Sequence, residues 1–130
     1  MSIDKYIEGL EPLITSFSIV TAHTITIDRK TPEIVFISGI IEFRNGATLD
    51  FKEFLENKKH GLEKYMYAYN YRMQSDVLFR YDNSPDPRAK GLQTFPHHKH
   101  LGSGKIIESA LVTLADILRE IENIYSPQEN

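Results

Sequence analysis

The sequence predicts a single α+β domain, in which helices at both ends of the chain pack against a bent antiparallel sheet of about five strands. Apolar residues recur every three or four positions near both ends, which is typical of amphipathic helices. Between them, several stretches alternate apolar and polar residues, as half-buried strands do. Asn45-Gly46 separates two such stretches and favours a tight hairpin. We expect one domain over residues 1–130, with a frayed polar tail at 126–130.

The two helices are predicted from their apolar spacing. The first is carried by apolar residues between Ile3 and Ile14, and Pro12 is expected to kink or end it. The second is carried by apolar residues between Ile107 and Tyr125. Within it, Thr113-Leu114-Ala115-Asp116 has the pattern of a capping box, which would allow a later start.

The first strands are predicted over 17–28 and 33–44, and the next begins after Asn45-Gly46. If these two residues form a two-residue turn, Glu42 lies opposite Leu49 and Ser38 lies opposite Glu53. Glu42 and Glu53 then share a face with apolar side chains. A carboxylate in that position is paired, at a sheet margin, or functional.

Two further strands are predicted over 62–73 and 77–82. The first of them places four tyrosines on one face: Tyr65, Tyr67, Tyr69 and Tyr71. A two-residue turn near Ser75-Asp76 sets Tyr71 opposite Arg80 and Tyr69 opposite Asp82, whereas a three-residue turn reverses the faces. We interpret the first two tyrosines as sheet packing, and Tyr69 and Tyr71 as candidates for stacking on unpaired bases.

The charge distribution favours an anionic ligand. The chain has a net charge of −3, but residues 58–105 carry a net charge of +5 and four of the five histidines. The absence of cysteine excludes disulfides and thiolate metal sites. No apolar run reaches eighteen residues, and the first residues lack the pattern of a secretory signal. We therefore expect a cytoplasmic protein that makes no use of a membrane.

The most unusual segment is Pro96-His97-His98-Lys99-His100. In an extended backbone, His98 and His100 point to one side while His97 and Lys99 point to the other. Imidazoles exchange protons near neutral pH, and Lys99 offers a fixed positive charge for a phosphate. The alternative is an exposed polar loop that links a strand to the last helix, although the preceding Phe95-Pro96 supplies an apolar anchor.

A second candidate segment, Arg80-Tyr81-Asp82-Asn83, ends a predicted strand. Arg80 can hold a phosphate through two hydrogen bonds, and Asp82 can orient a histidine. Alternatively, Asp82 and Asn83 only build a turn before Pro85, and Asp82 simply pairs with Arg80. A metal site from Asp82 with His97, His98 and His100 would need three ligands within four residues, so we predict a metal-free site without a cofactor.

Together these segments resemble the TumE family, small bacterial and archaeal toxins of toxin–antitoxin pairs. The resemblance rests on Arg80-Tyr81-Asp82-Asn83-Ser84-Pro85 followed by Thr94-Phe95-Pro96-His97-His98-Lys99-His100. The hairpin after Asn45, including Glu53, and the tyrosine-rich strand are also similar, so the likeness spans roughly residues 35–121. Family members usually carry one or two histidines after the proline, where this chain has Asp86-Pro87. The resemblance implies an antitoxin protein as partner.

The leading hypothesis is a toxin that acts on RNA as a metal-independent ribonuclease. An imidazole of His98 or His100 is the general acid or base, with another histidine or Glu53 as its complement. The predicted catalytic residues are His97, His98, His100, Glu53 and Asp82, and the predicted phosphate or substrate contacts are Arg80, Lys99, Asn83, Tyr69 and Tyr71. The alternatives are a non-catalytic module that binds RNA or protein, a metal-dependent hydrolase, or a motif that braces the fold or a homodimer.

Overall fold

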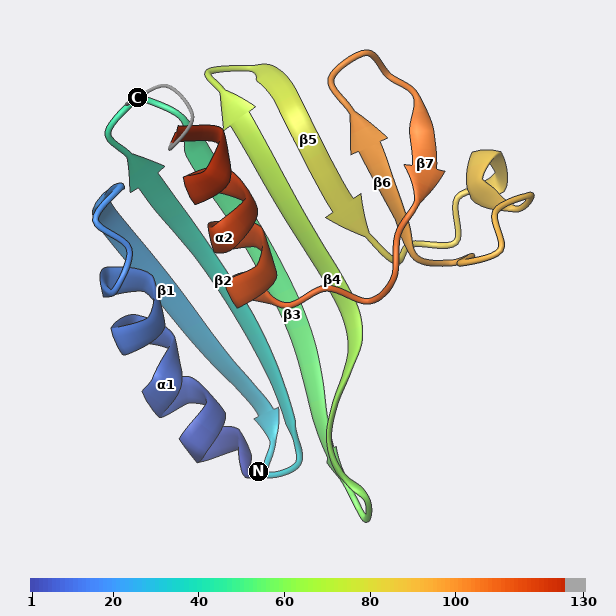
Figure 1. The fold of residues 1–130 in the computed structure, drawn as a ribbon. Coiled ribbons are helices and arrows are strands. Elements are labelled where there is room, and N and C mark those ends of the chain that lie inside the picture. Colours follow the sequence, from blue (N-terminus) through green and yellow to red (C-terminus); the bar gives the residue numbers. More distant parts are fainter. Residues whose placement is uncertain (126–130) are drawn as a thin grey trace.

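The protein folds into one antiparallel sheet with a helix near each end of the chain, seen in a computed structural model that describes residues 1–125 (Figure 1). The frayed tail expected at 126–130 lies outside the described residues. The elements are α1 (Ile3–Thr15), β1 (Val20–Thr31), β2 (Ile34–Phe43), β3 (Thr48–Lys58), β4 (Gly61–Met73), β5 (Asp76–Asp82), the 3-10 helix η1 (Pro87–Ala89), β6 (His98–Leu101), β7 (Ile106–Glu108) and α2 (Leu114–Tyr125). The strands pair in sequence order.

The α+β class is confirmed, but the prediction of about five strands was wrong, because the described chain has a seven-stranded sheet. The two additional strands, β6 and β7, are four and three residues long, too short for a period of two to stand out. The glycines after the histidine segment form the turn of this hairpin. Gly104 adopts φ +93°, and Leu101 N–H donates to the Lys105 carbonyl at 2.8 Å.

Both helices cover the same face of the sheet (Figure 1). We call this the helix face and the opposite one the outer face. The core lies between the helices and the sheet, with Ile14 of α1, Leu118 of α2 and Leu49 of β3 fully buried. At about 25 cal/mol per Å² of apolar surface, this burial is the main stabilising contribution. Among residues 1–125, no helix is long and apolar enough to cross a membrane.

The helix boundaries refine two expectations. Pro12 lies inside α1, which continues to Thr15, because the proline sits in the last turn and removes only one hydrogen bond there. The second helix begins at Leu114, not near Ile107. The predicted capping box is confirmed: Thr113 Oγ1 accepts from Asp116 N–H at 3.1 Å, and Asp116 accepts from Thr113 N–H at 2.9 Å.

The turn between β2 and β3 differs from the predicted two-residue form. Phe43 N–H donates to the Ala47 carbonyl, and Gly46 adopts φ +87°, so three residues form the loop. This moves the register by one residue, and Glu53 pairs with Ile37. Glu42 therefore lies on the outer face, opposite to Glu53, because side chains alternate along a strand.

The pairing of β4 with β5 also differs from the predicted register. The turn uses Gln74, which adopts φ +54°, and an irregularity follows Tyr71, so Tyr69 pairs with Tyr81. The buried tyrosines of β4 consequently lie on the helix face. Arg80 and Asp82 point to the outer face, away from these tyrosines.

Candidate functional site

The candidate site lies on the outer face, where β5 and β6 run side by side. The register pairs Asp82 with His98 and Arg80 with His100. Because alternate residues of a strand share a face, all four side chains lie on one side of the sheet. The extended backbone expected for the histidine segment is thus confirmed in β6.

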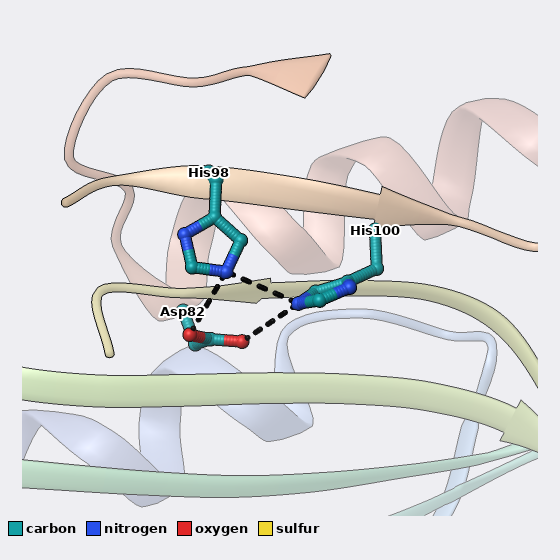
Figure 2. Close-up of side chains that lie close together, drawn as sticks. All are labelled: Asp82, His98 and His100. Carbon is teal, nitrogen blue, oxygen red and sulfur yellow. Dashed lines mark hydrogen bonds and ion pairs between the residues drawn. The ribbon is translucent and has the colours of Figure 1, made fainter. Parts of the chain in front are cut away.

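Three side chains meet within this site (Figure 2). His98 Nε2 lies 3.2 Å from Asp82 Oδ1, and His100 Nε2 lies 3.3 Å from Asp82 Oδ2. The two Nε2 atoms lie 3.1 Å apart. The carboxylate therefore presents one oxygen to each imidazole, and we call this group the Asp82–His98–His100 cluster.

Neighbouring groups hold the cluster in position. His98 Nδ1 lies 2.7 Å from the Pro96 carbonyl oxygen, which can only accept, so Nδ1 carries a hydrogen and donates it. Asp82 accepts from Ser84 N–H at 3.0 Å and from Arg80 Nε at 3.0 Å. These contacts fix the ring and carboxylate orientations, as supporting hydrogen bonds do in catalytic and metal sites.

Access to the cluster comes from the side of His100. The His98 side chain is fully buried and that of Asp82 is 4 % exposed, whereas that of His100 is 21 % exposed. Burial lowers the pKa of His100, against the charge of Asp82, which raises it. His100 lines an open cleft of about 420 Å³ together with Arg80 and Arg88. The charged and titratable residues that line this cleft are the two arginines, His100 and Asp76.

The segment that carries Arg88 begins with Asp86. Asp86 caps the short helix η1 and accepts from the Arg88 backbone N–H at 2.9 Å. Hydrogen bonds from the Arg88 side chain and backbone lower the pKa of Asp86 to about 2. This chain therefore places a carboxylate ion-paired with Arg88 beside the cluster.

His97 and Lys99 point away from the cluster, to the helix face. His97 Nδ1 lies 2.9 Å from Tyr67 Oη, and the two rings stack. Lys99 Nζ donates to Glu120 Oε2 of α2 at 2.8 Å and lies 4.9 Å from the centre of the Tyr81 ring. The predicted phosphate-binding charge of Lys99 is thus engaged by an acidic partner on the other side of the sheet.

Glu53 also lies on the helix face, fully buried. It accepts hydrogen bonds from Tyr6 Oη at 2.5 Å and from Tyr69 Oη, and Lys64 Nζ lies 3.7 Å from its carboxylate. Burial and the charge of Glu53 raise the pKa of both tyrosines, while burial lowers the pKa of Lys64. This group joins α1, β3 and β4 beneath the helices and does not meet the Asp82–His98–His100 cluster.

Three predicted substrate contacts have other partners in the structure. Tyr69 and Tyr71 are buried in the core, 0 % and 1 % exposed, so neither ring offers a face on which a base could stack. Asn83 uses its amide to extend the pairing of β4. Its Oδ1 accepts from Tyr67 N–H and its Nδ2 donates to the Tyr65 carbonyl, each at 3.0 Å.

The structure thus brings together four of the predicted site residues and adds Arg88, which the sequence did not single out. Arg88 lies in a stretch interpreted as a loop, and only its place in the basic segment pointed to it. Among residues 1–125, Asp82, His98 and His100 form a group whose ligand atoms lie within 4.8 Å of one another, as a metal site requires.

Comparison with known proteins gives one match. A family model described as "Toxin TumE" matches residues 10–125, which is nearly the whole chain and more than the sequence motifs alone cover. No curated protein and no solved structure matches the chain.

Proposed function

Because the chain belongs to the TumE toxin family, with the antitoxin partner that this family implies, we propose that it acts by cleaving RNA at the Asp82–His98–His100 cluster. The observation that carries this proposal is that imidazole and guanidinium groups lie together at one open cleft. His100, Arg80 and Arg88 all line it, and Asp82 and His98 lie behind His100.

The chemistry of phosphodiester cleavage matches these groups. In RNA, the 2′-hydroxyl loses its proton and its oxygen bonds to the adjacent phosphorus. The bond to the 5′-oxygen then breaks, and that oxygen gains a proton. The pentacovalent transition state carries additional negative charge, which positioned arginines stabilise. The cluster would accept the proton of the 2′-hydroxyl and donate one to the 5′-oxygen, while Arg80 and Arg88 would hold the phosphate.

The outer face also offers a surface on which bases can stack, in place of the buried Tyr69 and Tyr71. Phe36 and Phe54 stack with ring centres 4.3 Å apart, and Tyr65 lies 5.8 Å from Phe54 and is 40 % exposed. This aromatic patch (Phe36, Phe54, Tyr65) lies on the same face as the cluster. Tyr65 is the exposed ring of this patch, and exposed rings near basic groups are typical of surfaces that bind single-stranded nucleic acid.

The position of the patch suits a strand of RNA that runs across the sheet. Lys52 of β3 pairs with Ala68 of β4, which in turn pairs with Asp82 of β5. Lys52 therefore lies on the outer face, two strands away from the cluster. Phe54 follows Lys52 by one side-chain repeat. Strands lie about 4.8 Å apart and the repeat is about 7 Å, so Phe54 lies about 12 Å from Asp82 across the outer face.

Two chemistries are open to the cluster. Without a metal, His98 and His100 exchange protons with the substrate, as the sequence analysis expects. With a metal, the three side chains would be its ligands, and the ion would supply Lewis-acid activation of the nucleophile. Glu53, the complementary acid or base in the sequence hypothesis, is buried on the other face, so the metal-free route must use the cluster alone.

The proposal is tested by induced expression in a bacterial host. Cells expressing the wild type, His98→Ala or His100→Ala are followed by growth, and their total RNA is examined soon after induction. We expect growth arrest and new RNA fragments with the wild type only, while His60→Ala, a change in an exposed turn, behaves like the wild type.

Other outcomes point to the alternatives. Arrest with intact RNA would favour a module that blocks RNA or protein by binding, and such binding to RNA should weaken steeply with salt. If the purified His98→Ala and His100→Ala proteins are unfolded, the segment braces the fold. Arrest by both alanine variants, with fragments as in the wild type, would contradict the proposed catalytic centre.

A further inference from the structure

In the Asp82–His98–His100 cluster, hydrogen-bond acceptor atoms of three side chains face one another. Because His98 Nδ1 donates to the Pro96 carbonyl, the Nε2 of a neutral His98 can only accept. Nε2 nevertheless lies 3.2 Å from a carboxylate oxygen, which also only accepts. His100 Nε2, the third atom, brings at most one hydrogen to share between them. Positive charge placed between these atoms would be strongly stabilised.

We propose that Asp82, His98 and His100 bind one divalent first-row transition-metal ion. Two imidazoles and one carboxylate are a donor set that such ions favour. The sequence suggested that three ligands within four residues would be needed, but His97 is not among the three side chains that meet. His98 and His100 are alternate residues of β6, and Asp82 comes from the adjacent β5, so a regular strand pair directs all three to one point.

The distances between the ligand atoms fit this assignment. Bonds of 2.0–2.1 Å place neighbouring ligand atoms about 3.4 Å apart in a tetrahedral site and about 3.0 Å apart in an octahedral one. The two Nε2 atoms lie 3.1 Å apart, and they lie 3.2 and 3.3 Å from different oxygens of Asp82, so all three separations fall between these limits if the carboxylate binds through both oxygens. Only small rotations of the side chains would be needed to bind an ion.

The surroundings are those of a metal site. The Pro96 carbonyl fixes the tautomer of His98, while Ser84 N–H and Arg80 hold the carboxylate. Contacts of this kind orient metal ligands and are needed for full affinity. Burial of His98 and Asp82 shields the inner side, and His100 faces the cleft with Arg80 and Arg88. Three protein ligands with an open side are typical of catalytic rather than structural ions.

This inference deepens the proposed function, on which the role of the ion rests, although metal binding itself does not. A bound ion would supply a Lewis acid that favours loss of the 2′-hydroxyl proton or polarises the scissile phosphate. The chain's own residues would position the phosphate, with Arg80 and Arg88 on the cleft side of the ion.

The test is metal binding by the full chain. Purified protein is treated with chelator, desalted and titrated with Zn²⁺ by calorimetry and with Co²⁺ by visible absorption. We expect one ion per chain and a rise in melting temperature. For His100→Ala, whose side chain is part exposed, and for Asp82→Asn, we expect affinity at least about 100-fold lower. His60→Ala, which removes an exposed histidine outside the cluster, should bind like the wild type.

No saturable binding by the wild type, or binding unchanged in His100→Ala and lost in His60→Ala, would overturn the metal site. RNA cleavage separates the two proposals. If RNA is cleaved in the presence of chelator and no ion binds stoichiometrically, the ribonuclease proposal stands and the metal site is contradicted. Stoichiometric binding that depends on the cluster, with RNA left intact, keeps the metal site and removes the ribonuclease. Cleavage lost with chelator and restored by the ion supports both.

Discussion

Lys99 and His100 are neighbours in the sequence but lie on opposite faces of the sheet. Lys99 is paired with Glu120 beneath α2, whereas His100 lies 3.3 Å from Asp82 on the outer face. One peptide bond thus separates a structural ion pair from the candidate site. The alternation of side chains along β6 therefore decides which charged residues of the histidine segment can meet a substrate.

This division predicts different effects for two cations. Lys99→Ala should leave RNA cleavage unchanged and reduce the free energy of unfolding by about 1 kcal/mol, because it breaks a largely buried ion pair. Arg88→Ala should reduce kcat/KM at least about 10-fold with little change in stability, because Arg88 is exposed at the cleft. Urea unfolding and cleavage assays on both variants check this. The reverse pattern would place substrate on the helix face.

The aromatic patch gives a second prediction. Tyr65→Ala should raise KM for single-stranded RNA about 10-fold and leave kcat nearly unchanged, because stacking contributes about 1–3 kcal/mol per base. Tyr65→Phe keeps the ring and should retain the wild-type KM. If Tyr65→Ala has the wild-type KM, RNA does not cross this part of the outer face.

The buried group around Glu53 predicts strong coupling. Glu53→Met leaves Lys64 buried without its carboxylate, and should reduce the free energy of unfolding by about 3–5 kcal/mol. The double variant Glu53→Met/Lys64→Met should be more stable than the Glu53→Met single variant, because no unpaired charge remains. Urea unfolding of the four proteins in this cycle measures the coupling. Additive losses would show that the two side chains do not interact.

The buried tyrosines predict loss of stability at alkaline pH. Burial raises the pKa of Tyr67 to about 12 and raises the pKa of Tyr6 and Tyr69 further, whereas all three ionise near 10 in the unfolded chain. A group with a raised pKa stabilises the fold below its unfolded pKa, and this contribution is lost as pH rises above it. Lys64, with a lowered pKa, acts in the opposite direction but is a single group.

The urea midpoint should therefore fall from pH 8 to pH 11, together with the rise in tyrosinate absorbance. Tyr6→Phe removes one of these hydroxyls, and its midpoint should depend less on pH than that of the wild type. A midpoint that stays constant over this range would show that the tyrosine hydroxyls ionise without unfolding the protein.

The long elements could be predicted from the sequence because their patterns extend over many residues. The tyrosine strand and both helices are present, and the capping box at Thr113 gave the start of α2. Tyr65, predicted to share a face with the other three tyrosines, packs against Phe54 on the outer face, because an irregularity in the pairing of β3 with β4 lies beside it. Strands β6 and β7 could not be predicted, since three or four residues carry no measurable period. Both registers differ by one residue from those expected for two-residue turns: the first turn has an additional residue, and the second is displaced and followed by an irregularity after Tyr71. A shift of one residue reverses the faces.

The site was predictable only in part for the same reason. Arg80, Asp82, His98 and His100 come together because their strands pair in register, and residue types alone indicated them. Glu53 lies among apolar side chains, as predicted, but that face is opposite to the cluster, and the stacking role of Tyr69 and Tyr71 depended on which face the core occupies. Arg88 reaches the cleft through the path of a loop, which no periodicity in the sequence reveals.

The most direct test of the account is cleavage of an end-labelled single-stranded RNA by the purified protein, with the wild type beside Asp82→Asn. This variant keeps the size of a buried side chain and removes its charge at the centre of the cluster. We predict defined fragments with the wild type, in the presence of Zn²⁺ or Mn²⁺, and none with a folded Asp82→Asn protein. Intact RNA with the wild type under all these conditions, or equal cleavage by both proteins, would contradict it.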